Sequence, residues 1–116
     1  MLPIRSSAGF IALSKARARE REALIREASA YAERLRRELP DAQVFLYGSV
    51  ARGNWNLHSD IDLLVVGDLP AEPLARSAFL YRFVQGHEEP KGLMHDEFTS
   101  LERQGKLRYL EGALKL

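Results

Sequence analysis

The fold of this chain is decided by the stretch Val44-Phe45-Leu46-Tyr47-Gly48-Ser49-Val50-Ala51-Arg52-Gly53-Asn54-Trp55-Asn56-Leu57-His58-Ser59-Asp60-Ile61-Asp62-Leu63-Leu64-Val65-Val66. Residues 44–47 are aliphatic and aromatic, which is typical of a buried strand. Residues 61–66 are almost wholly apolar, as in a strand that is covered on both faces. Gly48 and Ser49 end the first apolar run. The stretch therefore predicts a strand, a tight turn, a short helix, a loop and a second strand.

Two carboxylates stand at the head of the second apolar run. Side chains alternate across a strand, so Asp60 and Asp62 are expected to point to the same face. Two neighbouring like charges repel, and either a cation or a bound proton must offset that repulsion. Hard carboxylate oxygens suit Mg²⁺, with Mn²⁺ as the second choice. Two such ions about 3.5–4 Å apart would form a clamp for phosphoryl transfer.

The turn at Gly48 and Ser49 supplies the complementary half of a polyphosphate site. Glycine allows a phosphate to approach the backbone closely, and Ser49 lies where a helix begins, so its N–H and hydroxyl can bind an anion. The alternative interpretation is a turn followed by a strand that begins with two solvated aspartates. The spacing Gly-Ser-x10-Asp-x-Asp arises by chance in about one per thousand chains of this size, which favours a nucleoside triphosphate site.

The motif residues that carry a family resemblance are Gly48-Ser49-x10-Asp60-x-Asp62, together with Arg52, Gly53 and Ser59. This motif resembles that of the DNA polymerase β-type nucleotidyltransferase superfamily. Within the superfamily, the short chain is similar to the minimal nucleotidyltransferases, which are the antitoxin partners of HEPN-domain toxins. The resemblance covers residues 44–98, and it is more specific for the superfamily than for this branch.

The resemblance implies transfer of AMP from ATP to a tyrosine hydroxyl of a HEPN-domain RNase toxin. It places the β- and γ-phosphates near Gly48, Ser49 and Arg52, and it makes Asp60 and Asp62 ligands of two Mg²⁺ ions. One alternative is a catalytically inactive antitoxin that neutralises its toxin by binding. Another is an enzyme that modifies a small molecule such as an aminoglycoside. Both a homo-oligomer and a hetero-oligomer remain open.

The superfamily's third metal-binding carboxylate, which acts as or beside the general base, falls on a later strand. Counting back from the acidic helix start at residues 96–98 selects Glu89, with Glu88 as the runner-up. Adjacent residues of a strand point to opposite faces, so only one of the two can join the aspartate pair. A third alternative is that both glutamates are solvated and the third carboxylate is missing.

Composition limits the class of protein. The 116 residues predict one domain, with a helical segment over residues 1–39 and a catalytic core over residues 42–98. Lys and Arg number 17 and Asp and Glu number 16, and the net charge of +1 does not point to a nucleic-acid partner. The chain has no cysteine, which excludes thiolate metal sites and a cysteine nucleophile. No signal peptide or membrane-spanning run is visible, so a cytoplasmic protein without a membrane partner is expected.

The N-terminal segment predicts a long helix over residues 11–39, after an irregular lead-in over residues 1–9. Arginines on this helix are interleaved with glutamates, which favours a solvated face over an RNA-binding one. Leucine, isoleucine, alanine and tyrosine recur at helical spacing and predict the face that packs on the core. The members of this stripe are Leu24, Ile25, Ala28, Tyr31, Ala32, Leu35 and Leu39.

The remainder of the chain predicts a helix over residues 71–84, an edge strand within residues 88–95 that Pro90 and Gly92 weaken, and a helix from Asp96. Residues 106–116 suit either a last short helix or a closing edge strand. The helix over residues 71–84 is expected to turn Leu74, Ala78, Tyr81 and either Phe79 or Phe83 toward the sheet.

Two residues of the polar loop have open roles. Trp55 suits either stacking on a nucleobase or capping the edge of the core. His58 suits a loop or supporting role rather than direct ligation of Mg²⁺, which prefers oxygen. Together the elements predict an α/β (α+β) fold. Its small mixed sheet has about four strands, with helices mainly on one face and a long helix at the N-terminus.

Overall fold

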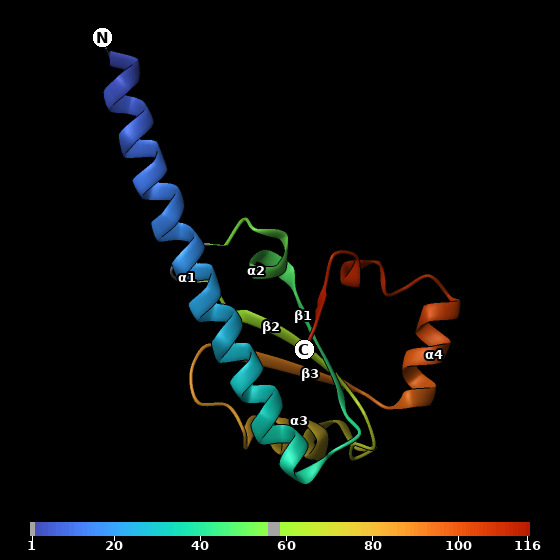
Figure 1. Ribbon diagram of the computed structural model, residues 1–116. Helices are drawn as coiled ribbons and strands as arrows, with labels where there is room; N and C mark the ends of the chain where they lie inside the picture. The colour runs from blue at the N-terminus through green and yellow to red at the C-terminus, as the bar shows by residue number, and fades with distance from the viewer. Residues whose placement is uncertain (1, 56–58) are drawn as a thin grey trace.

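The computed structural model describes residues 2–55 and 59–116, and their side chains from residue 12 onward. The expectation for His58 therefore lies outside the described residues. None of the described helices is long and apolar enough to cross a membrane. The elements, in chain order, are α1 (Leu2–Glu38), β1 (Gln43–Tyr47), α2 (Gly48–Arg52), β2 (Ile61–Val66), α3 (Pro73–Tyr81), β3 (Glu88–Leu93), α4 (His95–Arg103), the 3-10 helix η1 (Arg108–Leu110) and β4 (Leu114–Lys115) (Figure 1).

The four strands form one mixed sheet in the order β3-β2-β1-β4. Strand β1 runs antiparallel to both β2 and β4, whereas β2 and β3 are parallel and are joined through α3. The expected α/β architecture is confirmed. Strand β3 lies at an edge, as Pro90 and Gly92 predicted, because an edge strand tolerates the missing N–H of proline. Residues 106–116 contain both expected alternatives, a one-turn helix and an edge strand.

Helices α1 and α3 pack on the same face of the sheet, and the hydrophobic core lies between them and the strands (Figure 1). The inward side chains alternate along β1 and β2, as the period of a strand requires. Those of Val44, Leu46, Ile61, Leu63 and Val65 are fully buried. The apolar stripe predicted for α1 closes this core: Ala28, Tyr31, Ala32 and Leu35 are buried, and Leu24, Ile25 and Leu39 pack at its margin.

Helix α1 begins at Leu2, so the irregular lead-in expected over residues 1–9 is wrong. Pro3 lies in the first turn, where a helix needs no backbone N–H. Gly9 weakens a helix without breaking it. The N-terminal half of α1 consequently extends beyond the sheet as a continuous helix (Figure 1).

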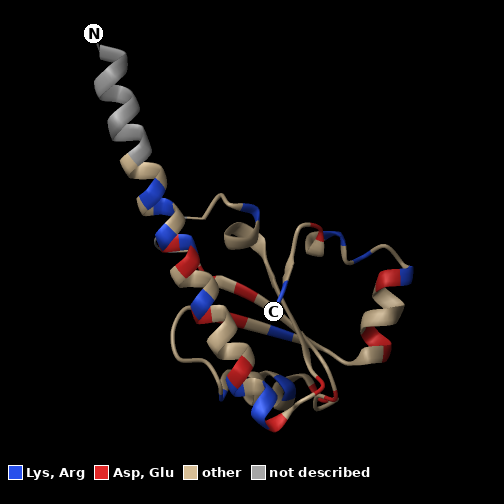
Figure 2. Ribbon diagram, viewed as in Figure 1, with Lys and Arg blue, Asp and Glu red and all other residues tan. Residues whose placement is uncertain are grey.

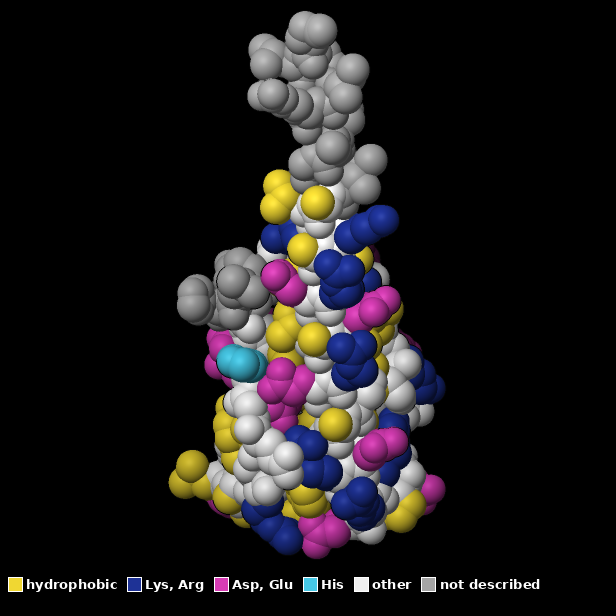
Figure 3. Space-filling model, turned by 60° about the vertical axis from the view of Figure 1, so that its left-hand side comes forward, with side chains coloured by type: hydrophobic (Ala, Val, Ile, Leu, Met, Phe, Trp, Pro, Cys, Tyr) yellow, Lys and Arg dark blue, Asp and Glu magenta, His cyan; other side chains and the backbone are white. Residues whose placement is uncertain are grey.

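Several arginines of α1 bind backbone carbonyls of other elements instead of forming a plain solvated face. Arg34 donates two hydrogen bonds to the carbonyl of Phe83, at 3.0 and 2.9 Å. Arg36 donates to the carbonyls of Ala42, at 3.0 Å, and Leu116, at 2.7 Å. On the face seen in Figure 3, basic and acidic side chains are interspersed along the helix. The arginines therefore fasten α1 to the body of the protein.

The face predicted for α3 is partly wrong. Leu74 and Tyr81 are exposed, with 78% and 49% of their surface accessible, whereas Leu80 is buried. Either Phe79 or Phe83 was expected to face the sheet, and both pack against the core. The helix is shorter than residues 71–84, since it begins at Pro73 and ends at Tyr81. Ala78, which was also expected to face the sheet, is exposed, and Leu80 takes the inward position together with Phe79 and Phe83.

The hydroxyl of Tyr31 joins α1 to α3 through a buried hydrogen bond of 2.8 Å to the carbonyl of Leu80. The variant Tyr31→Phe leaves this carbonyl without its donor, and we expect the free energy of unfolding to fall by about 1–2 kcal/mol in urea titrations. Tyr109→Phe is the matched control, because Tyr109 is 45% exposed, and it should change stability by less than about 0.5 kcal/mol. Equal losses in the two variants would contradict the role of the Tyr31 hydroxyl.

Candidate active site

The candidate site lies where β1 ends and β2 begins. Strand β1 passes into α2 at Gly48, and β2 starts directly after Asp60. Asp62 is the cross-strand neighbour of Tyr47 on β1 and of Glu89 on β3, so the three side chains form one row on one face of the sheet. Figure 2 shows acidic segments of β2 and β3 side by side. This face is opposite to the one covered by α1 and α3.

Neighbouring negative charge raises the pKa values of two carboxylates at this point, Asp62 and Glu89. The pKa of Glu89 is raised chiefly by the negative charge of Asp60 and further by that of Asp62. Burial and then the charge of Asp60 raise the pKa of Asp62. The structure thus brings together the three acids that the sequence selected, and a nearby cation would offset their repulsion.

Glu88, the runner-up for the third carboxylate, faces the opposite side of the sheet. It is 2% exposed, and its Oε2 accepts hydrogen bonds from Arg34 and from the N–H of Gln85, both at 3.0 Å. Alternation along β3 means that the register which brings Glu89 beside Asp62 turns Glu88 toward α1. Of the two glutamates, only Glu89 therefore lies in the carboxylate row.

The turn at Gly48 is in direct contact with the carboxylate row. Gly48 has a φ of +76°, a conformation that L side chains rarely adopt, and a Cβ at this position would overlap the carboxylate of Asp62. The next residue, Ser49, accepts hydrogen bonds at its carbonyl from the N–H groups of Gly53, at 3.0 Å, and Asn54, at 3.1 Å. Both the conformation and the close approach therefore require glycine at the entrance to α2.

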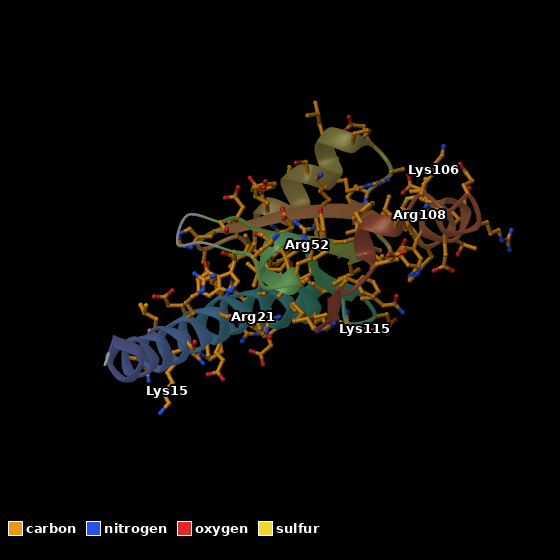
Figure 4. The ribbon with its side chains drawn as sticks, turned by 90° about the horizontal axis from the view of Figure 1, so that it is seen from above. Lys15, Arg21, Arg52, Lys106, Arg108 and Lys115 are labelled. Carbon is orange, nitrogen blue, oxygen red and sulfur yellow. The ribbon has the colours of Figure 1, made fainter. Side chains whose placement is uncertain are left out.

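Two cations lie near the carboxylates. Lys91 and Arg52 both oppose the rise in the pKa of Asp62, and Lys91 does the same for Glu89. Arg52, at the end of α2, was selected from the sequence as a phosphate ligand (Figure 4). Lys91 was missed, although its signal was present: it follows Glu89 by two residues on a strand, so the two side chains share a face. The site therefore combines three acids with a lysine and an arginine.

Aromatic side chains border the site on the β1 side. Burial and the charge of Asp62 raise the pKa of Tyr47 to about 12, so its hydroxyl stays protonated at neutral pH. Its ring packs on that of Tyr109, with 5.2 Å between the ring centroids. Trp55 is 3% exposed and belongs to the hydrophobic core. Trp55 therefore takes the second of its two expected roles, capping the core edge, and is not free to stack on a nucleobase.

The donor set suits a hard divalent cation in its chemistry. Carboxylate oxygens are the ligands that Mg²⁺ prefers, and the raised pKa values of Asp62 and Glu89 show negative charge that a cation would compensate. Among the described residues, no three His, Asp or Glu side chains have converged into a ready-made metal cage.

Substitution of Gly48 by Ala tests the close approach of the turn to Asp62. Gly53→Ala is the matched control, because Gly53 has a comparable φ of +85° but would place its Cβ in open space. We expect Gly53→Ala to lower the free energy of unfolding by about 1–2 kcal/mol from backbone strain alone. Gly48→Ala should lower it by at least 1 kcal/mol more, as an order-of-magnitude estimate for overpacking. Equal losses in urea titrations would argue against the contact.

Repulsion within the carboxylate row should make stability depend on pH. Because the pKa values of Asp62 and Glu89 lie above their ordinary values of 3.8 and 4.5, the folded protein binds protons more tightly than the unfolded chain. This contribution therefore destabilises the fold as pH rises through the raised values. In EDTA, Asp60→Asn should be more stable than the wild type at pH 7, and the difference should vanish below pH 3.8. Urea titrations across this range measure the difference, with the exposed Asp68→Asn as the control.

Comparison with known proteins gives one family and one solved structure. Residues 28–114 match the family model described as the nucleotidyltransferase domain, a span that contains every candidate site residue named from the sequence. The crystal structure of "a putative nucleotidyltransferase from Sulfolobus solfataricus" resembles this chain with a TM-score of 0.67 and 20% identity, over 85% of this chain and 84% of that chain. At this identity, the resemblance establishes the fold alone.

No curated protein matches the sequence. The family model nevertheless spans well over half of the chain, and the structure shows the four-stranded sheet and the Gly-Ser and Asp-x-Asp elements of its motif in contact. The chain belongs to the nucleotidyltransferase domain family, within the DNA polymerase β-like superfamily.

Proposed function

We propose that the chain is a Mg²⁺-dependent enzyme that transfers AMP from ATP to a hydroxyl group of a partner protein. The observation that carries the proposal is the pairing of Asp62 with Glu89 across β2 and β3, with Asp62 against the Gly48 turn and the charge of Asp60 acting on both carboxylates. A polyphosphate held at the turn would place its α-phosphorus beside these carboxylates. Family membership supports nucleotidyl transfer as the reaction class.

Each residue of the site then has a separate task. Gly48, Ser49 and Arg52 bind the β- and γ-phosphates, through backbone N–H groups, a hydroxyl and a guanidinium. Asp60, Asp62 and Glu89 would hold two Mg²⁺ ions, or Mn²⁺ in their place, and these would supply charge neutralisation and alignment at the α-phosphorus. Lys91 adds positive charge on the same face. Most of the rate enhancement would come from positioning and electrostatics.

The proposed transfer forms one bond to phosphorus and breaks another. The acceptor oxygen forms a bond to the α-phosphorus, the bond from the α-phosphorus to the bridging oxygen breaks, and pyrophosphate leaves with the electron pair. Glu89 takes the proton from the acceptor hydroxyl. Arg52 would stabilise the charge on the departing pyrophosphate.

A tyrosine of a HEPN-domain RNase toxin is the proposed acceptor, which would make the chain an antitoxin that acts by adenylylation. Asp60 and Glu89 are exposed, so the carboxylate row is accessible to a side chain carried by another protein. The resemblance to minimal nucleotidyltransferases supports this acceptor over a small molecule.

The proposal is tested by incubating the chain with ATP, Mg²⁺ and a HEPN-domain protein from a neighbouring reading frame of the source genome, followed by intact-mass spectrometry. We expect an AMP adduct on the HEPN protein, and Asp62→Asn should lower its rate of formation by at least about 10²-fold. Asp68→Asn, away from the site and exposed, is the matched control and should keep the wild-type rate. Metal-dependent ATP binding without any adduct would instead identify an inactive antitoxin that acts by binding. An adduct that forms equally well with Asp62→Asn would refute the assignment of the site.

A further inference from the structure

Two arginines of α1 hold the segment between β1 and β2 without belonging to the candidate site. Arg21 donates hydrogen bonds from Nε to the carbonyl of Val50, at 3.0 Å, and from Nη2 to the carbonyl of Ala51, at 3.1 Å. Arg17 donates from Nη2 to the carbonyl of Trp55, at 3.0 Å, and its guanidinium carbon lies 4.4 Å from the centroid of the Trp55 ring. The reaction described above uses neither arginine.

Helix α2 needs such support because it is only five residues long. A helix of this length closes few internal hydrogen bonds, so it has little stability of its own, and the carbonyls of its last turn have no partner within the helix. Arg21 supplies donors to two of these carbonyls and places a positive charge at the C-terminal end of the helix. The orientation of Gly48 and Ser49, the first two residues of α2, therefore depends on a side chain from α1.

Arg17 fixes the chain that follows α2. Trp55 is nearly fully buried, and the guanidinium over its ring adds a cation–π contact to the hydrogen bond at its carbonyl. Arg17 and Arg21 are four residues apart, so they project from the same face of α1. Figure 4 shows Arg21 where α1 passes α2. One face of α1 thus contacts both α2 and Trp55.

We propose that Arg21 and Arg17 are positioning residues, through which α1 sets the placement of the Gly48–Ser49 turn relative to the carboxylate row and thereby the affinity for nucleotide. The affinity part of this inference rests on the proposed function. The placement part does not, because it concerns contacts within the free protein.

Nucleotide affinity tests the proposal with three variants. Arg21→Met keeps the length of the side chain but removes its donors, Arg21→Lys restores one donor, and Arg36→Met is the matched control. Arg36 also donates two hydrogen bonds from α1 to backbone carbonyls, but at Ala42 and Leu116, away from the turn. Calorimetric titration with ATP and Mg²⁺ is performed at a temperature at which circular dichroism shows every variant folded. We expect the Kd to rise about tenfold in Arg21→Met, less in Arg21→Lys, and under twofold in Arg36→Met.

Hydrogen exchange without nucleotide gives an independent readout. Arg21→Met should speed amide exchange over residues 48–54 and leave β1 and β2 unchanged, whereas Arg36→Met should leave residues 48–54 unchanged. Arg17→Met should also shift the fluorescence of Trp55, the one tryptophan of the chain. If the wild type fails to bind ATP with Mg²⁺, the proposed function fails while the exchange data still test placement. If the amides of residues 48–54 exchange in Arg21→Met at the same rate as in the wild type, the positioning role is overturned.

Discussion

The register of three neighbouring strands holds the carboxylates of this protein together against their own repulsion. Asp62 lies opposite Tyr47 on one side and Glu89 on the other, and Asp60 precedes it on the same face. The resulting rise in the pKa values of Asp62 and Glu89 lowers the stability of the folded protein at neutral pH. Such a concentration of like charge is characteristic of a site that acts on a polyphosphate with divalent cations, and the family assignment agrees with it.

The opposite face of the sheet supplies the stability that this arrangement requires. Alternate residues of β1 and β2 are buried beneath α1 and α3, and the hydroxyl of Tyr31 joins the two helices through the carbonyl of Leu80. Glu88, the immediate neighbour of Glu89, belongs to this face and is paired with Arg34. Glu88 and Glu89 therefore face opposite sides of the sheet, because adjacent side chains of a strand point in opposite directions.

Helix α1 contacts both the hydrophobic core and the turn at the candidate site. Its apolar stripe closes the core, while Arg21 and Arg17 reach the carbonyls of α2 and of Trp55. The five-residue helix α2 is also held by the burial of Val50 and by Ala51, which packs at the margin of the core. The long helix is thus part of the support for the turn as well as a cover for the sheet.

The sequence by itself determined the features that depend on neighbours along the chain: the two apolar strands, the Gly-Ser turn, the shared face of Asp60 and Asp62, and the stripe of α1. These follow from the period of a strand or a helix and from the backbone freedom of glycine. The resemblance favoured Glu89 over Glu88, but only the strand register places Glu89 beside Asp62, and tertiary structure alone decided which face of α3 is buried and what the arginines of α1 bind. Those outcomes depend on strand register and on contacts between segments tens of residues apart, for which a linear pattern carries no signal.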